Sequence, residues 1–193
     1  MKLPSRWYTV QVRKKPQILH AETIAKTRLF HVEQVDLRFS NGVEVRYERL
    51  HSSSRGAVLV VPMLDRDTVL LIREYAAGVG RYELALPKGR IEKGETPLQA
   101  ANREMMEEVG YGANQLRHLT SLTIAPGYLG HTTHVVLAQD LYVQKEPGDE
   151  PEEIEVVPWR LSRLKELLAC ADCTEARSIA ALFIVRELLA NEH

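Results

Sequence analysis

The residues with the clearest chemical potential are three glutamates within five positions, Glu104, Glu107 and Glu108. In a helix, at about 100° of rotation per residue, the three lie on one arc, and Glu104 and Glu108 are one turn apart. Carboxylate oxygens are the ligands that hard divalent cations such as Mg²⁺ and Mn²⁺ prefer. Three neighbouring anions repel one another unless a cation lies between them. The cluster therefore predicts metal binding, although such a cluster in isolation is more often a solvated acidic face.

These glutamates belong to a longer pattern that spans Gly89–Tyr111 and reads GRIEKGETPLQAANREMMEEVGY. The pattern resembles the signature box of the Nudix hydrolases, enzymes that cleave a nucleoside diphosphate linked to another group. The resemblance implies that the glutamates hold Mg²⁺ or Mn²⁺, and that the backbone carbonyl of Lys88 is a further metal ligand. It also implies that Gly89, Glu95 and Arg103 support the site by tying the loop to the helix.

A second acidic segment, Glu146–Glu155, contains six carboxylates and follows the last long apolar run. In Nudix enzymes of the ADP-ribose type, acidic residues of this loop complete the metal site or accept a proton from the attacking water. The resemblance assigns Glu152 as a metal ligand and Glu150 as the base, and it counts Glu107 with them as catalytic. A solvated acidic loop remains the alternative for either residue of this loop taken alone.

Three cations, Arg73, Lys88 and Arg90, are candidates to bind the substrate phosphates. Arg73 ends an apolar run, where related enzymes place a phosphate-binding arginine, but a surface arginine with a buried stem would look the same. Tyr75 or Tyr128 could stack on a base, although core or rim packing is the better explanation for each of them alone.

Two further pairs suggest metal or redox chemistry only weakly. Cys170 and Cys173 form a C-x-x-C, but zinc would need two more ligands and no matching pair exists in the sequence. We therefore expect reduced, structural thiols. His131 and His134 lie at the head of an expected strand, where this spacing sends the two rings to opposite faces. His131 could still line the cleft.

The glutamates require a helix that begins and ends at defined residues. Thr96 can cap its start, Pro97 suits the first helical position, and Gln99 completes a capping box. Gly110 is expected to end it in the left-handed conformation. An apolar stripe on this helix would pack on a sheet and leave the glutamates at a cleft. The stripe consists of Leu98, Ala101, Met105 and Val109.

The remaining elements are expected from apolar alternation and turn residues. Asn41-Gly42 predicts a hairpin with a type I′ turn within meandering strands over residues 18–50. Asp65-Arg66-Asp67 predicts a second hairpin. Strands are expected over residues 57–64, 68–73, 82–86, 116–124 and 132–143, and helices over residues 161–168 and 174–190.

The resemblance implies the α/β Nudix fold, an α/β/α sandwich around a mixed sheet, with a small N-terminal antiparallel β-extension. We expect a leader over residues 1–16, a β-extension over 17–55 that makes a homodimer, and a hydrolase domain over 56–193. The net charge of −1 argues against long nucleic acid or an anionic membrane as partner. No apolar run spans a membrane and the start has no signal-peptide core, so we expect a cytoplasmic protein.

Residues outside the box narrow the expected substrate. Pro126 lies sixteen positions beyond Gly110, which is typical of ADP-ribose pyrophosphatases. Over roughly residues 17–190 the chain also resembles a bacterial subgroup, the ADP compounds hydrolases, in motifs such as FSNG, IREYA and GDEP. This implies hydrolysis of ADP-ribose, NADH and diadenosine triphosphate with release of AMP.

One motif departs from the ADP-ribose enzymes. They carry ELPAG into the box, whereas this chain reads Glu83-Leu-Ala-Leu-Pro-Lys-Gly89. The role of Glu83 and the preferred substrate therefore stay open. The alternatives are a dinucleoside polyphosphate or RNA 5′-end hydrolase of the same fold, and a non-catalytic sensor of an ADP-containing ligand. A sensor usually lacks a box glutamate, and none is missing from this sequence.

Overall fold

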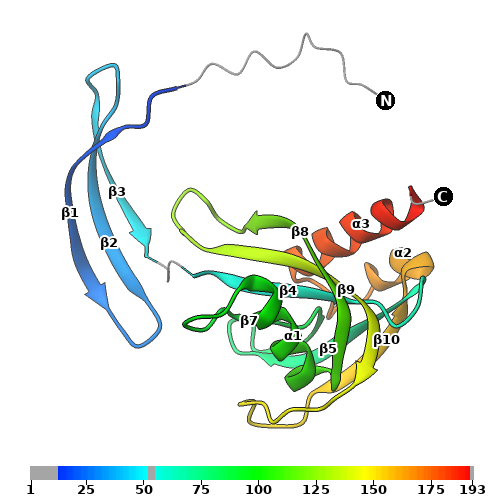
Figure 1. The fold of residues 1–193 in the computed structure, drawn as a ribbon. Coiled ribbons are helices and arrows are strands. Elements are labelled where there is room, and N and C mark those ends of the chain that lie inside the picture. The colour runs from blue at the N-terminus through cyan, green and yellow to red at the C-terminus, as the bar shows by residue number, and fades with distance from the viewer. Residues whose placement is uncertain (1–12, 52–54, 192–193) are drawn as a thin grey trace. The chain divides into compact units, whose positions relative to one another are not determined.

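A computed structural model describes residues 13–51 and 55–191 of the chain (Figure 1). Most of the expected leader, residues 1–12, lies outside the described residues. The chain divides into two compact units, each described here by itself. The first comprises the chain up to Ser52 together with Gly127–Gly130, and the second comprises the rest.

The first unit is a three-stranded antiparallel sheet in the order β1-β2-β3. Its strands are β1 (Gln17–Lys26), β2 (His31–Arg38) and β3 (Glu44–Leu50), as the meander predicted. Val35 is the one buried apolar side chain among the described residues of this unit. The amide of Leu50 donates to the carbonyl of Tyr128 at 2.7 Å, which attaches the 127–130 segment to the sheet.

The turn between β2 and β3 differs from the expected type. Gly42 has a φ of 85°, but Asn41 is not left-handed, because Asp140 is the only non-glycine with positive φ in the described part of the chain. The amide of Gly42 donates to the carbonyl of Phe39, and that of Phe39 to the carbonyl of Val43, each at 2.9 Å. The hairpin is therefore confirmed, while the type I′ turn, which needs two left-handed residues, is wrong.

The second unit contains two sheets. One has the order β10-β5-β6 and the other the order β7-β4-β9-β8. β4 and β9 pair in parallel and the other pairs are antiparallel, so the four-stranded sheet is mixed. The strands are β4 (Ala57–Pro62), β5 (Thr68–Ala76), β6 (Arg81–Ala85), β7 (Lys88–Arg90), β8 (Tyr111–Thr123), β9 (Thr132–Val143) and β10 (Glu155–Arg160).

β4 and β5 do not form the expected second hairpin. The turn exists, since the amide of Leu64 donates to the carbonyl of Thr68 at 2.8 Å, but only Met63 and Val69 then pair. Beyond that bridge the strands enter different sheets. β5 pairs with β6 on one side and with β10, a strand that was not expected, on the other.

The helix that carries the glutamates is α1 (Pro97–Glu108). The capping box at Thr96 and Gln99 is confirmed: the Thr96 hydroxyl accepts from the Gln99 amide, and the Gln99 side chain accepts from the Thr96 amide. Gly110 follows with a φ of 79°. The helix expected over residues 161–168 is a 3₁₀ turn, Leu161–Arg163, followed by the short α2 (Leu164–Leu167). The last helix is α3 (Ala176–Ala190), capped by Glu175.

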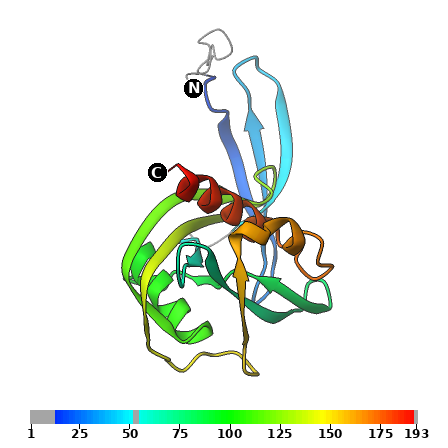
Figure 2. The same ribbon diagram turned by 90° about the vertical axis from the view of Figure 1, so that its right-hand side faces the viewer.

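Side-chain alternation along β4, β5 and β9 divides the interior into two cores. One core packs against α1 and the other against α2 and α3, which gives the expected α/β/α layers (Figure 2). The α1 side includes Val58, Val60, Leu70, Ile72, Ala101 and Met105. The opposite side includes Leu59, Val61, Leu71, Leu137, Leu164 and Leu182. Within the described residues, no helix is long and apolar enough to cross a membrane.

Candidate active site

The apolar stripe of α1 packs into its core as expected, and this places the box glutamates beside β7. Ala101 and Met105 are fully buried, while Glu104 and Glu108 retain only 8% and 3% of their surface. One Glu108 oxygen accepts the backbone amide of Lys88 at 2.9 Å. The carboxylate of Glu104 lies against Gly89 so closely that a β-carbon there would overlap it. The helix and the loop before it are thus joined through the carboxylates themselves.

Arg103 is the centre of this arrangement. Its guanidinium donates to both oxygens of Glu95, at 2.7 and 3.1 Å, and to the backbone carbonyl of Arg90 at 3.0 Å. It also donates to Glu104 at 2.9 Å and to Glu107 at 3.0 Å. The hydrogen bond from Arg103 lowers the pKa of the Glu95 carboxyl, and the surrounding acids raise the pKa of Arg103. One side chain therefore ties the box loop to two of the three glutamates.

The buried carboxylates are poorly compensated as anions. Burial raises the pKa of the Glu108 carboxyl to about 8, against an opposing effect of the Lys88 charge and amide. Burial also raises the pKa of Glu104 and of Glu107, and Arg103 only partly offsets it. In the described part of the chain, no three His, Cys, Asp or Glu side chains lie close enough together to hold an ion as they stand. An all-oxygen donor set whose members resist ionisation nevertheless fits a hard divalent cation, which would supply the absent positive charge.

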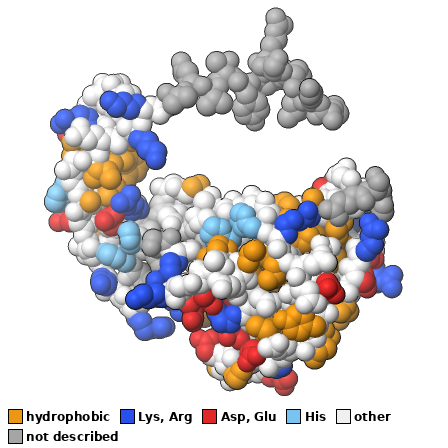
Figure 3. Space-filling view, viewed as in Figure 1, with side chains coloured by type: hydrophobic (Ala, Val, Ile, Leu, Met, Phe, Trp, Pro, Cys, Tyr) orange, Lys and Arg blue, Asp and Glu red, His pale blue; other side chains and the backbone are white. Residues whose placement is uncertain are grey.

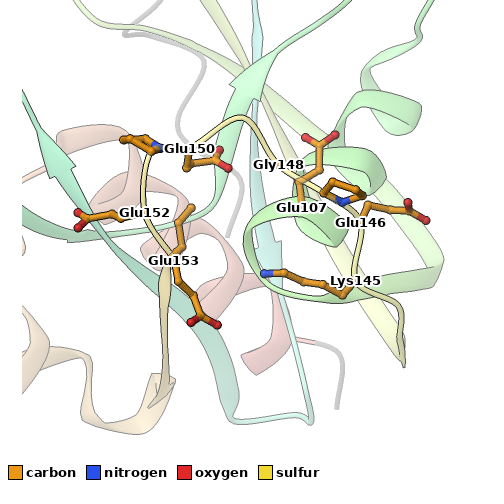
Figure 4. Close-up of a pocket in the computed structure, with 10 residues that line it drawn as sticks. Glu107, Lys145, Glu146, Gly148, Glu150, Glu152 and Glu153 are labelled. Carbon is orange, nitrogen blue, oxygen red and sulfur yellow. The ribbon is translucent and has the colours of Figure 1, made fainter.

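The two candidate glutamates of the acidic loop face different neighbours. Glu150 lines a cavity together with Glu104, Glu107 and Glu108, and its negative charge helps to raise the pKa of Glu104 and of Glu107. Glu152 instead accepts a hydrogen bond from the hydroxyl of Tyr82 at 2.7 Å. Figure 4 shows their side chains directed to different sides of the loop. Glu150 thus shares one cavity with all three box glutamates, whereas Glu152 lines a neighbouring cavity with Glu107.

Cations line the same cavity, whose volume is about 680 Å³. Acidic and basic side chains gather side by side on the face drawn in Figure 3. Lys88 donates to Glu74 at 2.9 Å, so its charge is partly engaged. Arg90 lines the cavity as predicted, together with Arg55 and Lys93, which the sequence did not single out. The side chains of these last three form no ion pair within residues 13–51 and 55–191. Neither residue could be singled out from the sequence, because Arg55 lies in a loop outside the box and Lys93 occupies a variable position within it.

Arg73 does not line this cavity. Its guanidinium donates to Glu155 at 3.0 Å and pairs with Asp172. Glu83, whose role was open, is buried and accepts hydrogen bonds from Arg81, from the Thr174 amide and from the Thr174 hydroxyl. Both residues join β5 and β6 to the segment that precedes α3.

The remaining candidates of the second unit do not line this cavity either. Tyr75 packs edge-on against Tyr82, with ring centroids 5.4 Å apart. His134 lies beside His118 rather than beside His131. Cys170 and Cys173 are free thiols, and burial raises the pKa of Cys173, as expected for a structural residue. Tyr128 belongs to the first unit.

Comparison with known proteins agrees with this fold. Residues 53–182 match the NUDIX domain, and residues 16–49 match the NudE-type Nudix hydrolase N-terminal domain. The chain therefore belongs to the Nudix hydrolases, as the box predicted, and it is an enzyme of that family.

Its likeness to particular members is high. It is 50% identical to the ADP compounds hydrolase NudE of Escherichia coli strain K12, over 93% of this chain and 96% of the relative. It is 30% identical to an ADP-ribose pyrophosphatase of Bacillus subtilis strain 168, over 85% of this chain and 91% of that protein. A crystal structure of an ADP compounds hydrolase superposes with a TM-score of 0.87 at 50% identity, covering 93% of this chain and 97% of that one.

Proposed function

We propose that this chain is a divalent-cation-dependent hydrolase that cleaves the pyrophosphate bond of ADP-linked compounds and releases AMP. The substrates we propose are ADP-ribose, NADH and diadenosine triphosphate. The observation that carries the proposal is one cavity lined by the buried, poorly compensated Glu104 and Glu108. The same cavity is lined by Arg90, Arg55 and Lys93, which form no ion pair among the described residues. The names of the two relatives, an ADP compounds hydrolase and an ADP-ribose pyrophosphatase, support the ADP-linked class.

The residues that would hold the cation are Glu104, Glu107, Glu108 and the carbonyl of Lys88. Glu152 would join them through the carboxylate oxygen that does not accept the Tyr82 hydroxyl. We propose Mg²⁺ or Mn²⁺, because all of these donors are oxygens. When bound, such an ion supplies positive charge against the diphosphate and makes water easier to deprotonate. Gly89, Glu95 and Arg103 have the supporting role: Gly89 admits the Glu104 carboxylate, and Arg103 and Glu95 hold the loop.

Phosphate binding and proton transfer would be carried out by the protein's own side chains. Arg90, with Arg55 and Lys93, would bind and orient the two phosphates, since they line the cavity and form no ion pair in the part of the chain that the structure describes. Glu150 would accept the proton of the water that attacks phosphorus, because it faces the box glutamates. One phosphorus–oxygen bond forms and the bridging one breaks. ADP-ribose would then yield AMP and ribose 5-phosphate.

We also propose that the first unit makes a homodimer. A three-stranded sheet with one buried apolar side chain has almost no core of its own. Several of its apolar side chains are exposed, including Ile18, Ile24, Leu29, Phe30 and Val43. Light scattering at several protein concentrations tests this, and a monomer at all of them would contradict it.

The function is tested with a panel of ADP-linked compounds incubated with Mg²⁺ or Mn²⁺, with products separated by chromatography. We expect AMP from the proposed substrates and none in the presence of EDTA. GDP-mannose, in which both the base and the sugar differ, serves as the control substrate outside the ADP-linked class. Tight binding of ADP-ribose without any AMP would contradict the proposal and would favour a sensor.

A further inference from the structure

The acidic loop between β9 and β10 is held at both of its ends. At its start, the amide of Gln144 donates to the carbonyl of Gly110 at 3.1 Å, and the amide of Glu146 donates to the carbonyl of Met106 at 3.2 Å. Near its end, the hydroxyl of Tyr82 donates to Glu152 at 2.7 Å. The first attachment is to α1 and to the glycine that follows it, and the second is to β6.

Tyr82 is a strand residue rather than a loop residue, and it is half-exposed. It lies in β6 directly opposite Tyr75 of β5, and their rings pack edge to face at an interplanar angle of 71°. The Tyr82 hydroxyl is the donor in this hydrogen bond, because the Glu152 carboxylate can only accept. A strand tyrosine whose ring packs on a neighbouring tyrosine can therefore determine where Glu152 lies.

The anchor at Glu152 bears on Glu150 because Pro151 separates them. The proline ring restricts the backbone at that position, so the directions of the two flanking carboxylates are coupled. Glu150 reaches the box side of the loop: its carboxylate covers Gly148, where a side chain would overlap it and would come within 3.7 Å of the Glu107 β-carbon. With Glu152 bonded to Tyr82, Glu150 lines the cavity of the box glutamates.

We propose that Tyr82 is a positioning residue for the reaction: by binding Glu152 it orients Glu150 toward the box glutamates. This rests on the proposed function, in which Glu150 accepts the proton of the attacking water. Tyr82 has Glu152 and Tyr75 as its side-chain partners. It acts through the loop, and its contribution belongs to turnover rather than to substrate affinity.

The test compares Tyr82→Phe with Tyr75→Phe in the full-length chain. Tyr82→Phe removes the hydroxyl that Glu152 accepts, whereas Tyr75→Phe removes a hydroxyl from the same ring pair without touching the loop. We expect Tyr82→Phe to lower kcat about tenfold or more with KM within about twofold, because a small misplacement of a catalytic group is costly. Tyr75→Phe should keep kcat within about twofold. Equal kcat values for Tyr82→Phe and the parent chain would overturn the proposal.

A second measurement separates positioning from general damage to the fold. In a Glu150→Gln background, Tyr82→Phe should cause no further loss of kcat, because the group it positions has been removed. A loss of the same size in both backgrounds would overturn the proposal. The two proposals also fail separately. If the parent chain releases no AMP, the proposed function is wrong. If the parent chain is active and Tyr82→Phe is equally active, only the role of Tyr82 is wrong.

Discussion

The carboxylate of Glu104 lies against the α-carbon of Gly89 and leaves no room for a side chain at position 89. The contact joins the strand β7 to α1 where residues of both elements line the cavity. A glycine is needed there for close approach, since Gly89 is not among the residues with positive φ.

Gly89→Ala should therefore disable the site while the protein stays folded. The new methyl group must displace Glu104, and we expect a loss of about a hundredfold in kcat, typical of a misplaced active-site group. Steady-state kinetics measures the loss of kcat, and circular dichroism checks that the variant stays folded. Gly78→Ala is the matched control, because a β-carbon at Gly78 meets nothing within 4 Å. Similar losses in both variants would mean that the Glu104 contact is not responsible.

Glu108→Gln should remove cation-dependent turnover. The variant keeps the shape of the side chain and an oxygen that can accept the Lys88 amide, but it loses the charge that would hold the ion. We expect kcat/KM to fall at least about a hundredfold at saturating Mg²⁺. Glu187→Gln, an exposed position on α3, is the control. Turnover near that of the parent chain would exclude Glu108 as a ligand.

Cation binding should release a proton near neutral pH. The raised pKa keeps Glu108 protonated below about 8 in the metal-free chain, so binding at pH ~7 must displace up to about one proton. At pH ~9 the carboxylate is already ionised and the release should vanish. Calorimetry in buffers of different ionisation enthalpy measures this. A release that does not change between the two pH values, or that persists in Glu108→Gln, would contradict the assignment.

The same shift gives the metal-free chain a pH-dependent stability. Glu108 ionises near its ordinary value when the chain unfolds but only around pH 8 when folded. Its contribution is therefore fully present below the ordinary carboxyl pKa and is lost as the pH rises through about 8. Between pH ~5 and ~9 the Tm measured in EDTA should fall, and Glu108→Gln should flatten that fall. A parallel decline in both proteins would place its cause elsewhere.

Glu83→Gln should cost stability and leave chemistry intact. The buried carboxylate accepts three hydrogen bonds, and an amide can keep only some of them. We expect a loss of about 1–3 kcal/mol in the free energy of unfolding. Urea unfolding measures it, and kcat should stay within about twofold. A large fall in kcat without loss of stability would give Glu83 a catalytic role.

Local features of this fold could be predicted from the sequence, and non-local ones could not. The start of α1 is determined by Thr96, Pro97 and Gln99, which are neighbours, so the capping box was predictable. The pairing of β5 with β10 depends on residues more than 80 positions apart, such as Arg73 and Glu155. Turn residues at 65–67 indicate that the chain reverses direction, but they do not indicate which strands pair with β4 and β5.

The same distinction holds for the site. The box glutamates share one helix, so their proximity follows from their spacing. The resemblance predicted Glu150 as the base, but the hydrogen bond between Tyr82 and Glu152 could not be predicted, because the two residues are 70 positions apart in the sequence. The sequence position of Arg73 suggested a phosphate ligand, but in the folded chain its guanidinium pairs with Glu155 and Asp172.

The alternation in β4 has a consequence for how this chain can change in evolution. Val58 and Val60 face the side of α1 and the cavity, while Leu59 and Val61 face α2 and α3. Inserting or deleting a single residue within the strand would exchange the two sets and present each core with side chains of the other. Substitutions on the α3 side can therefore accumulate independently of catalysis, but length changes in this strand are compatible with the fold only in pairs.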